Sequence, residues 1–407
     1  MAKTKHQNEN FKKILTELYT KKPISRIDIS RNTNITAATI TEITSQLKVE
    51  NLIEECGKYE VYENKNGRKK ILLTISKGHS YYIGVEFARD MLNISLTDNL
   101  GNEINSQHTN LDHVYSDTLK EVDLIQKTIE SFVQQHHEYH PCAIGIAIPG
   151  HFDVDRQKIA TNNEFWRNFD LKSLLSQISL PIYIENNVHC MTIYEQYISQ
   201  KTKNENFVFF HAAKGIFASN LYNGNLYGAQ NFNVGEIGHT IVTPNGELCK
   251  CGRRGCLQTY IGEEQLLDKA KIIYRQSSQT FLHSLVTKEE SIELKTIVDA
   301  YKLGDLGCIK LIEDAFNSVV ITLNNLKMTM DIEKIFIHGP LLSNSEVNHL
   351  LFEFINYKKL FPDKEEINIE IVPYSKKNGS LGACALAIRN QLIMSLPAHN
   401  KIDSELT

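Results

Sequence analysis

The spacing of apolar residues near the start of the chain predicts two helices separated by a short break. A first set recurs at positions i, i+3, i+4 and i+7, the spacing of one buried helical face; it consists of Phe11, Ile14, Leu15 and Leu18. Pro23 stops this helix, and Ser25 followed by Asp28 is a capping-box-like start for a second, shorter one. We expect the second helix to end near Asn34, because asparagine tolerates the left-handed backbone conformation that a tight turn requires.

A third helix is expected to begin at about Thr36, with Ile40, Ile43 and Leu47 facing inward. A short helix, a turn and a longer helix are the order of a helix-turn-helix, in which small polar residues at the start of the last helix approach base edges in the major groove. We therefore predict that DNA is bound by the residues left on the outer face there, which are Thr36, Ala37, Thr39 and Thr41.

The next segment, KYEVYENKNGRKKILLTI, predicts a β-hairpin. Asn66 and Gly67 stand between two strand-like runs, and a type I′ turn needs positive φ at both central positions. Such a hairpin after three helices is typical of a wing, whose cations can contact phosphates or the minor groove. The cations at its tip are Lys65, Arg68, Lys69 and Lys70. The alternative is a solvated, charged hairpin beside three helices that only pack together.

The charge distribution separates this front module from the rest of the chain. Residues 1–78 hold 15 Lys and Arg against 9 Asp and Glu, whereas the remainder holds 29 against 39. A basic module on an acidic body suggests a polyanion as partner of the first part only. The 407 residues, 42% of them hydrophobic, are enough for two or three structural units. We find neither a membrane-spanning apolar run nor a secretory signal, so we expect a cytoplasmic protein with no membrane partner.

A cluster of cysteines predicts a metal centre. The eight cysteines are too few and too unevenly spread for a disulfide scaffold. Three of them fall with a histidine in the run GEIGHTIVTPNGELCKCGRRGCLQTY, whose glycines allow a tight loop. One imidazole and three thiols suit a closed, tetrahedral Zn²⁺ site with no open position for catalysis. We therefore predict a structural zinc bound by His239, Cys249, Cys251 and Cys256. The alternative is a set of free thiols beside a core histidine.

The same run carries a resemblance to a known family. E-x-G-H followed by C-x-C-G-x-x-G-C resembles the hallmark of the ROK family, named for repressors, open reading frames and sugar kinases. Four further segments look like family motifs: IGIAIPGHFD (144–153), NNEFW (162–166), IENN (184–187) and SLGACALA (380–387). The resemblance covers about residues 80–390. With the front module, the chain resembles the sugar-responsive ROK repressors, including the xylose repressors.

The resemblance implies the architecture of the whole chain. We expect an α/β protein with an N-terminal winged helix-turn-helix and a two-lobed actin-like/ribonuclease H-like ROK domain, which holds a monosaccharide between its lobes. The expected domains are a DNA-binding domain at 1–78, a first lobe at 79–190 plus 380–407, and a second lobe with the zinc motif at 191–379.

The residues that kinase members of the family need are missing. In those members the Asp of an E-N-D motif is the general base, and glycine-rich turns hold the ATP phosphates. Here Asn187 stands at the base position, so we predict no catalytic residue and no enzymatic activity. Glu86-Phe87-Ala88-Arg89-Asp90 replaces the first turn, D-x-G-G-T. Later turns are altered as well, to AKGIFAS (213–219) and His338-Gly339-Pro340.

Sugar-site positions are better preserved. Carried over by motif, the resemblance assigns sugar binding to Asn163, Asn186, Asn187, Glu236, His239 and Gln258. His239 would serve both zinc and sugar, with one ring nitrogen for each. Gln258 stands where the family usually has a glutamate, so a charged acceptor has become a neutral amide.

These features together predict a sugar-responsive transcriptional regulator, in the first instance a repressor. It would bind double-stranded operator DNA through the winged helix and a monosaccharide effector in the cleft, as a homodimer or homotetramer. Two alternatives stay open. One is an ATP-dependent ROK sugar kinase with an appended DNA-binding domain, and the other is a DNA-binding protein whose sugar cleft has decayed.

Overall fold

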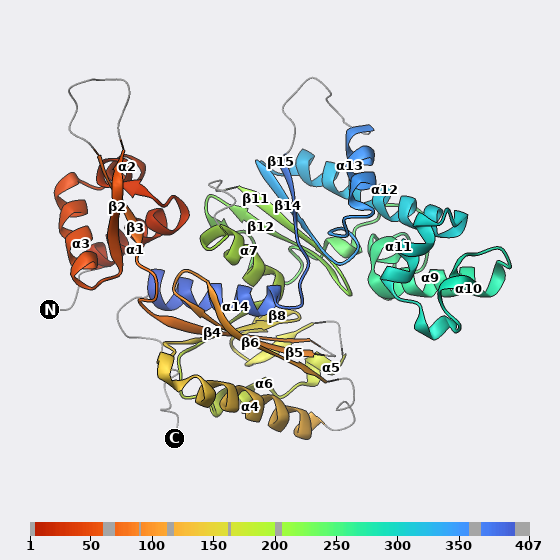
Figure 1. Ribbon diagram of the computed structural model, residues 1–407, viewed down its shortest axis with the longest axis horizontal. Coiled ribbons are helices and arrows are strands. Elements are labelled where there is room, and N and C mark those ends of the chain that lie inside the picture. The colour runs from red at the N-terminus through yellow and green to blue at the C-terminus, as the bar shows by residue number, and fades with distance from the viewer. Residues whose placement is uncertain are drawn as a thin grey trace. The chain divides into compact units, whose positions relative to one another are not determined.

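The computed structural model describes residues 5–59, 70–88, 91–111, 118–161, 164–199, 206–357 and 368–394. The chain divides into two compact units, and each is described by itself (Figure 1). The first unit comprises Met1–Lys203 and Lys376–Thr407, and the second comprises Asn204–Ser375. The expected lobe boundary after Cys190 lies inside helix α7 (Asn187–Tyr197), which belongs whole to the first unit.

The N-terminal module, residues 5–75, contains the predicted order of helices. Ser25 caps the second helix by accepting a hydrogen bond from the backbone N–H of Asp28, and Asn34 ends it with φ of 57°. Thr36 caps the third helix in the same way, accepting from the N–H of Thr39. The elements are α1 (Lys5–Thr20), β1 (Ile24–Ser25), α2 (Arg26–Thr33), α3 (Ala37–Val49), β2 (Ile53–Tyr59) and β3 (Lys70–Ile75).

The apolar faces predicted for these helices meet in one core. Residues of α1, α2 and α3 are fully buried there, among them Ile14, Leu18, Ile29, Ile40 and Leu47. The three strands pair in the order β1-β3-β2, and β2 and β3 are antiparallel from Ile53↔Ile75 to Tyr59↔Lys70. The hairpin expected on both sides of Asn66-Gly67 therefore begins as predicted, but its tip, with Lys65, Arg68 and Lys69, lies outside the described residues.

The rest of the first unit is a five-stranded mixed sheet of order β10-β7-β4-β5-β6. The strands are β4 (Tyr81–Ala88), β5 (Met91–Asp98), β6 (Glu103–Asn110), β7 (Ile144–Ile148) and β10 (Ile182–Asn186). Strands β4, β5 and β6 are antiparallel, whereas β7 runs parallel to both β4 and β10. A small hairpin, β8 (His151–Asp153) and β9 (Lys158–Ala160), precedes α5 (Glu164–Asn168).

Helices cover both faces of this sheet (Figure 1). Ile83, Val85 and Phe87 of β4 point into a core shared with α4 (Thr118–Gln135) and α6 (Leu171–Ser176). The alternate residues face α14 (Asn378–Ile388), which lies directly on the strands. Glycine makes this approach possible, because a Cβ at Gly145 would lie 1.9 Å from the carbonyl oxygen of Ala383. The single turn η4 (Arg389–Ile393) continues α14.

The second unit is a further five-stranded sheet, of order β13-β12-β11-β14-β15. Its strands are β11 (Phe207–Ala212), β12 (Ile216–Tyr222), β13 (Asn225–Leu226), β14 (Lys334–His338) and β15 (Asn368–Val372). The helical segments are η2 (Ile237–His239), α8 (Gln258–Ile261), α9 (Glu263–Gln276), α10 (Leu282–Leu285), η3 (Glu289–Ser291), α11 (Leu294–Lys302), α12 (Leu306–Thr329) and α13 (Asn348–Tyr357). Phe210, Ile337, Phe316 and Val319 form the centre of its core. Within the described ranges, no helix is long and apolar enough to cross a membrane.

Candidate functional site

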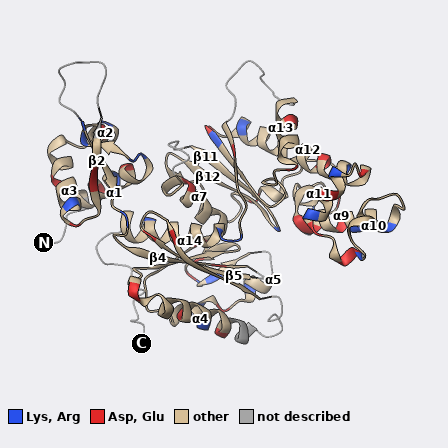
Figure 2. Ribbon diagram, in the orientation of Figure 1, with Lys and Arg blue, Asp and Glu red and all other residues tan. Residues whose placement is uncertain are grey.

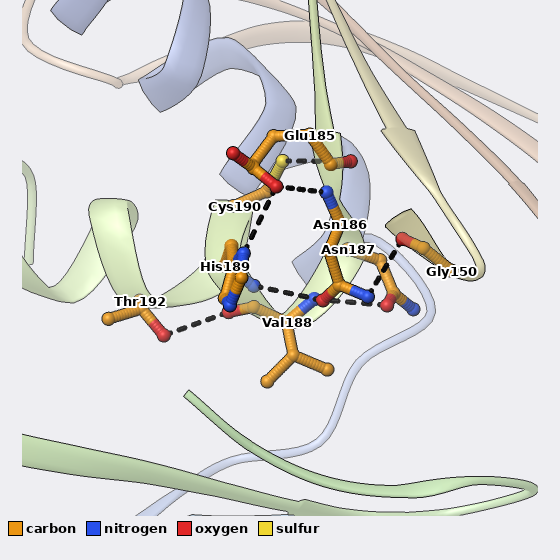
Figure 3. A network of polar contacts seen from close by, with 8 residues as sticks. All are labelled: Gly150, Glu185, Asn186, Asn187, Val188, His189, Cys190 and Thr192. Carbon is orange, nitrogen blue, oxygen red and sulfur yellow. Dashed lines mark hydrogen bonds and ion pairs between the residues drawn. The ribbon is translucent and has the colours of Figure 1, made fainter. Parts of the chain in front are cut away.

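Asn186 stands at the junction of β10 and α7 and is the N-cap of that helix. Its Oδ1 accepts hydrogen bonds from the backbone N–H groups of Val188, at 2.8 Å, and His189, at 3.2 Å (Figure 3). Its Nδ2 donates to the carbonyl oxygen of Gly150 at 3.0 Å. The side chain is buried and satisfies helix N–H groups that would otherwise lack partners. Asn186 therefore fixes the start of α7 against the turn at Gly150.

Asn187, the first residue of α7, is only half buried. Its Oδ1 accepts from the N–H of Val188 at 3.0 Å, and its side chain is hydrogen-bonded to the carboxyl group of Glu86. Because the carboxyl group receives the amide hydrogen, the amide is held in one orientation. An amide cannot accept a proton at neutral pH, so this position can hold a hydroxyl group but cannot deprotonate it.

Glu86 is a buried carboxyl group in the segment that replaces the first phosphate turn, and its contact with Asn187 is not apparent from the sequence. It lies on the face of β4 toward α14, where a Cβ at Gly379 would be 1.9 Å from its carboxyl carbon. Burial raises the pKa of Glu86 to about 7, although hydrogen bonds from Asn93 and Asn187 lower it. The one sequence signal for this role is a charged residue inside the apolar run of β4. Arg89 and Asp90 lie outside the described residues.

His189 belongs to the same network and does not extend into solvent. Its Nδ1 lies 3.0 Å from Oε1 of Glu185, which also accepts from the N–H of Asn186 at 2.8 Å (Figure 3). The ring is buried, and its centroid is 6.0 Å from that of His151. The pair ties the first turn of α7 to the end of β10, which indicates a structural role for His189.

Glu236, His239 and Gln258 are brought together in the second unit, around Gly238. The N–H of His239 donates to the carbonyl oxygen of Glu236 at 3.1 Å. Oε1 of Gln258 lies 3.1 Å from the position that a Cβ at Gly238 would take. Glu236 is exposed, yet desolvation by the protein around its carboxyl group raises its pKa.

The amide of Gln258 is oriented by two acceptors. Its Nε2 donates to the carbonyl oxygen of Lys214 at 3.1 Å and to Oε1 of Gln265 at 3.2 Å. Both amide hydrogens are thereby engaged, so Oε1 is the atom left to accept from a ligand. Gln258 therefore presents an uncharged acceptor at the position where the family resemblance implies a glutamate. Asn163, the remaining sugar-site prediction, lies outside the described residues.

The predicted metal ligands His239, Cys249, Cys251 and Cys256 form one cluster, in which the ligand atoms all lie within 4.8 Å of one another. Nδ1 of His239 is 3.6 Å from Sγ of Cys249, and the sulfurs of Cys251 and Cys256 are also 3.6 Å apart. Two sulfurs on a tetrahedral Zn²⁺ with bonds of about 2.3 Å would be about 3.8 Å apart. The donor set and its spacing therefore fit a zinc ion.

The backbone of the loop explains how these ligands converge. The N–H of Cys249 donates to the carbonyl oxygen of Arg253 at 2.8 Å, closing a tight turn. Gly255 has φ of 75°, and a Cβ there would lie 1.7 Å from the carbonyl oxygen of Thr243. Burial and the charge of Arg253 lower the pKa of His239, which favours the neutral ring that a metal requires. Since Nδ1 faces the sulfurs, Nε2 is the nitrogen that a second ligand would use.

Two histidines pack at the carboxyl ends of β11 and β14, the edge where open α/β sheets usually bind ligands. The rings of His211 and His338 are stacked with centroids 5.0 Å apart, and their Nδ1 atoms are 2.8 Å apart. Burial lowers the pKa of His211, and the neighbouring His338 lowers it further. A Cβ at Gly339 would lie 1.9 Å from the carbonyl oxygen of Ala212, so the glycine is needed here for close strand packing.

The start of α3, where DNA binding is predicted, is largely exposed. Thr36, Ala37 and Thr41 are exposed, and Thr39 is half buried. The hydroxyl group of Thr41 donates to the carbonyl oxygen of Ala37 at 2.8 Å, which leaves it as an acceptor. Lys70 is bound within the module instead, with Nζ 3.1 Å from Oδ1 of Asp28. Figure 2 shows cations and anions side by side in this module, where Lys48 pairs with Glu55 at 2.7 Å.

Comparisons with known proteins agree with this arrangement. A family model described as "ROK family" matches residues 82–390. The xylose repressor of Bacillus spizizenii is 29% identical over 338 residues, which cover 82% of this chain and 83% of that protein. This relative is named for regulation and not for catalysis.

Solved structures share the fold at lower identity. One is described as a ROK family transcriptional regulator, a homolog of E. coli MLC protein; it has a TM-score of 0.74 at 21% identity and covers 94% of this chain and 96% of its own. A ROK family glucokinase from Streptomyces griseus has a TM-score of 0.64 at 20% identity and covers 76% of this chain and 100% of its own. The predicted two-lobed ROK fold behind an N-terminal helical region is confirmed.

Proposed function

The chain belongs to the ROK family, and we propose from this premise that it is a sugar-responsive transcriptional repressor that binds its sugar without phosphorylating it. The single observation that carries the proposal is the environment of Asn187. At the position of the kinases' base there is an amide, and the neighbouring carboxyl group of Glu86 is occupied in holding that amide. A site built in this way can retain a ligand, and the residue at its base position cannot deprotonate that ligand.

The N-terminal module is the proposed DNA-binding domain, a winged helix-turn-helix. Support comes from the capped helices α2 and α3, the turn at Asn34 and the hairpin of β2 and β3. The exposed start of α3 would enter the major groove of double-stranded operator DNA. The wing would supply Lys65, Arg68 and Lys69 for phosphates. Lys70 has the weaker support of the four, because it already pairs with Asp28.

The effector is proposed to be a monosaccharide, as the resemblance to the sugar-responsive members of the family implies. Asn187 in the first unit and Glu236, His239 and Gln258 in the second present amide, carboxyl and imidazole groups suited to sugar hydroxyls. Asn163 is a further proposed contact, whereas Asn186 would act by positioning α7. The name of the Bacillus spizizenii relative makes D-xylose the first sugar to test.

The Cys3His cluster is proposed to hold a structural Zn²⁺. His239, Cys249, Cys251 and Cys256 would bind the ion, and it would supply four bonds that fix the loop carrying Glu236 and His239. This chain's part is to bring the ligands within 4.8 Å and to keep His239 neutral. The metal would then set the direction in which Nε2 of His239 meets the sugar.

Two copies of the chain are proposed to act together, as a homodimer or as a homotetramer. Operator half-sites one helical turn apart, about 34 Å, make the spacing of two modules decisive for affinity. A change in that spacing on sugar binding need alter operator affinity by only about 1–3 kcal/mol to regulate a gene.

The test is a titration of operator binding with sugars at constant salt. DNA selected by the full-length protein from a random duplex pool serves as operator, and D-xylose, D-glucose and N-acetyl-D-glucosamine form the first panel. At least one sugar is expected to change the operator Kd by 5-fold or more. If no monosaccharide changes it, and none raises the melting temperature, the sensor proposal is wrong.

The competing function is an ATP-dependent sugar kinase. It must be tested because a ROK family glucokinase shares the fold. Coupled ADP release with hexoses, pentoses and amino sugars distinguishes the two. We expect no turnover above the background hydrolysis of ATP, because the amide of Asn187 cannot accept the hydroxyl proton and the first phosphate turn carries bulky side chains in place of glycines. Turnover at rates typical of kinases, about 1–100 per second, would replace the sensor by an enzyme.

A further inference from the structure

Within the first unit, one buried asparagine joins the N-terminal module to the five-stranded sheet. The hydroxyl group of Tyr19, in α1, donates to the backbone oxygen of Asn99 at 3.0 Å. Nδ2 of Asn99 donates to the carbonyl oxygen of Ser76 at 2.9 Å, and its Oδ1 accepts from the N–H of His79 at 3.0 Å. Ser76 and His79 lie in the segment between β3 and β4. Asn99 therefore holds both α1 and the connecting segment.

The surroundings of this joint are sealed from water. Tyr19 and Asn99 are 1% and 0% exposed. Nζ of Lys22 lies 5.2 Å from the centre of the Tyr19 ring, and among the described residues it has no hydrogen-bond partner. Burial lowers the pKa of Lys22 to about 8, while the charge of Asp98 raises it. A lysine withdrawn from water in this way marks a packed interface between module and sheet, and not a loose tether.

Helix α7 ends at the same joint. It begins at Asn187, the proposed sugar contact, and extends over 11 residues, or about 16 Å, to Tyr197. The side chain of Tyr197 is hydrogen-bonded to Thr16 of α1 and to Arg389 at the end of α14. The next residue, Ile198, packs on the turn that contains Asn99, where a Cβ at Gly101 would lie 2.3 Å from it.

The packing of α7 prevents its two ends from moving independently. Helix α14 lies between α7 and the sheet, and a Cβ at Gly382 would be 2.7 Å from the carbonyl carbon of Cys190. Contacts this close leave no room for the helix to bend into α14. In such interiors a displacement at one end is passed to the other, because packed helices shift as bodies.

We propose that α7 is the relay of the regulator: sugar binding at Asn187 shifts the helix, and Tyr197 passes the shift through Thr16 to α1 and the DNA-binding module. This proposal rests on the proposed function and specifies how sugar binding would regulate DNA binding. Tyr19 and Asn99 are the pivot on which the module turns. Tyr197 and Tyr19 are positioning residues, since neither contacts sugar or DNA in this scheme.

The test separates coupling from binding. Tyr197→Phe and Thr16→Val each remove one side of the α7–α1 hydrogen bond at nearly constant volume, and Tyr274→Phe in the second unit is the matched control. For each full-length protein we measure the operator Kd with and without the panel sugar that acts on the wild type, and the sugar Kd without DNA. Both variants are expected to keep each separate Kd within about 3-fold, and the sugar-induced change in operator Kd should fall from 5-fold or more to below about 2-fold. The control should behave as wild type.

The outcomes distinguish the relay from the function on which it rests. If both variants respond to sugar as fully as the wild type, the relay is wrong and the sensor remains. If no panel sugar changes the operator affinity of the wild type, the sensor is overturned and the relay falls with it. A purely structural role for Tyr197 would lower stability and both affinities together, without selective loss of the response, and that result would also overturn the relay.

Discussion

The loop around the metal ligands and the start of α7 are both proposed to meet the sugar, yet they are held in opposite ways. At the start of α7 the polar atoms of Asn186 and Asn187 already find partners inside the protein. In the loop, three sulfurs and one nitrogen lie within 4.8 Å of one another, a spacing at which one metal ion could bind all four. The start of α7 is thus held by hydrogen bonds alone, whereas the loop is expected to depend on metal.

Removing the metal should have the largest effect. It should act on the loop and leave the hydrogen bonds at the start of α7 in place. Cys256→Ser takes away a buried ligand, and structural Zn²⁺ contributes about 10–16 kcal/mol to the folding of small metal domains. We expect loss of zinc from the purified protein, a lower melting temperature and loss of the sugar response. The control is Cys142→Ser, whose thiol lies in the first unit. If the two variants had equal zinc content and equal stability, the prediction that the loop depends on a bound metal would be wrong.

The second effect concerns Glu86 and appears as a dependence on pH. Its folded pKa of about 7 is raised from 4.5, so the folded protein binds the proton more tightly than the unfolded chain. The stability that this contributes is complete below about pH 4.5 and is lost as pH rises through about 7, by up to ~3 kcal/mol. Glu86→Gln should abolish this loss, as measured by urea unfolding at pH 5 and pH 8. The exposed Glu138→Gln should retain it. A wild type with equal stability at both pH values would contradict the assignment.

A smaller effect should separate the two asparagines. Asn186→Ala removes the cap of α7 and the bond to Gly150, and should cost about 1–3 kcal/mol of stability. Asn187→Ala should cost less, because the residue is only half buried, but should weaken sugar binding more. Urea unfolding and the sugar-induced shift of the melting temperature measure the two effects. If both variants lost stability and sugar affinity to the same extent, the assignment of capping to Asn186 and of sugar contact to Asn187 would be wrong.

Features that depend on neighbouring residues were predictable from the sequence. The cap at Ser25, the start of a helix at about Thr36, the turn at Asn34 and the grouping of the cysteines with His239 all follow from short spacings, and the structure has each of them. In these cases the backbone between the residues is short enough to fix their geometry. The identity of the metal and the sugar contacts stay predictions.

Features that join distant segments could not be predicted in this way. The bond between Lys70 and Asp28 spans 42 residues, so a cation expected at the wing tip is instead half buried in the module. The link between Glu86 and Asn187, and the joint of Tyr19 with Asn99, likewise bring together residues far apart in the chain. Nothing in the local pattern marks their partners, because these depend on how strands and helices stack.

The smallest effect is expected for a substitution at the base position itself, and this substitution is the strictest test of the proposed non-catalytic site. Asn187→Asp restores the residue type that the kinases use as base, yet we expect no phosphotransfer. The new carboxyl group would face the buried Glu86, and two carboxyl groups in contact share one proton, so at least one would stay protonated near neutral pH. Pairing the change with Glu86→Gln relieves the repulsion, but the turn that should hold phosphate still carries bulky side chains. Coupled ADP release with the panel sugars should therefore remain at background for both variants. Turnover in the double variant alone would show that Glu86, and not the loss of the phosphate turns, keeps this site from chemistry.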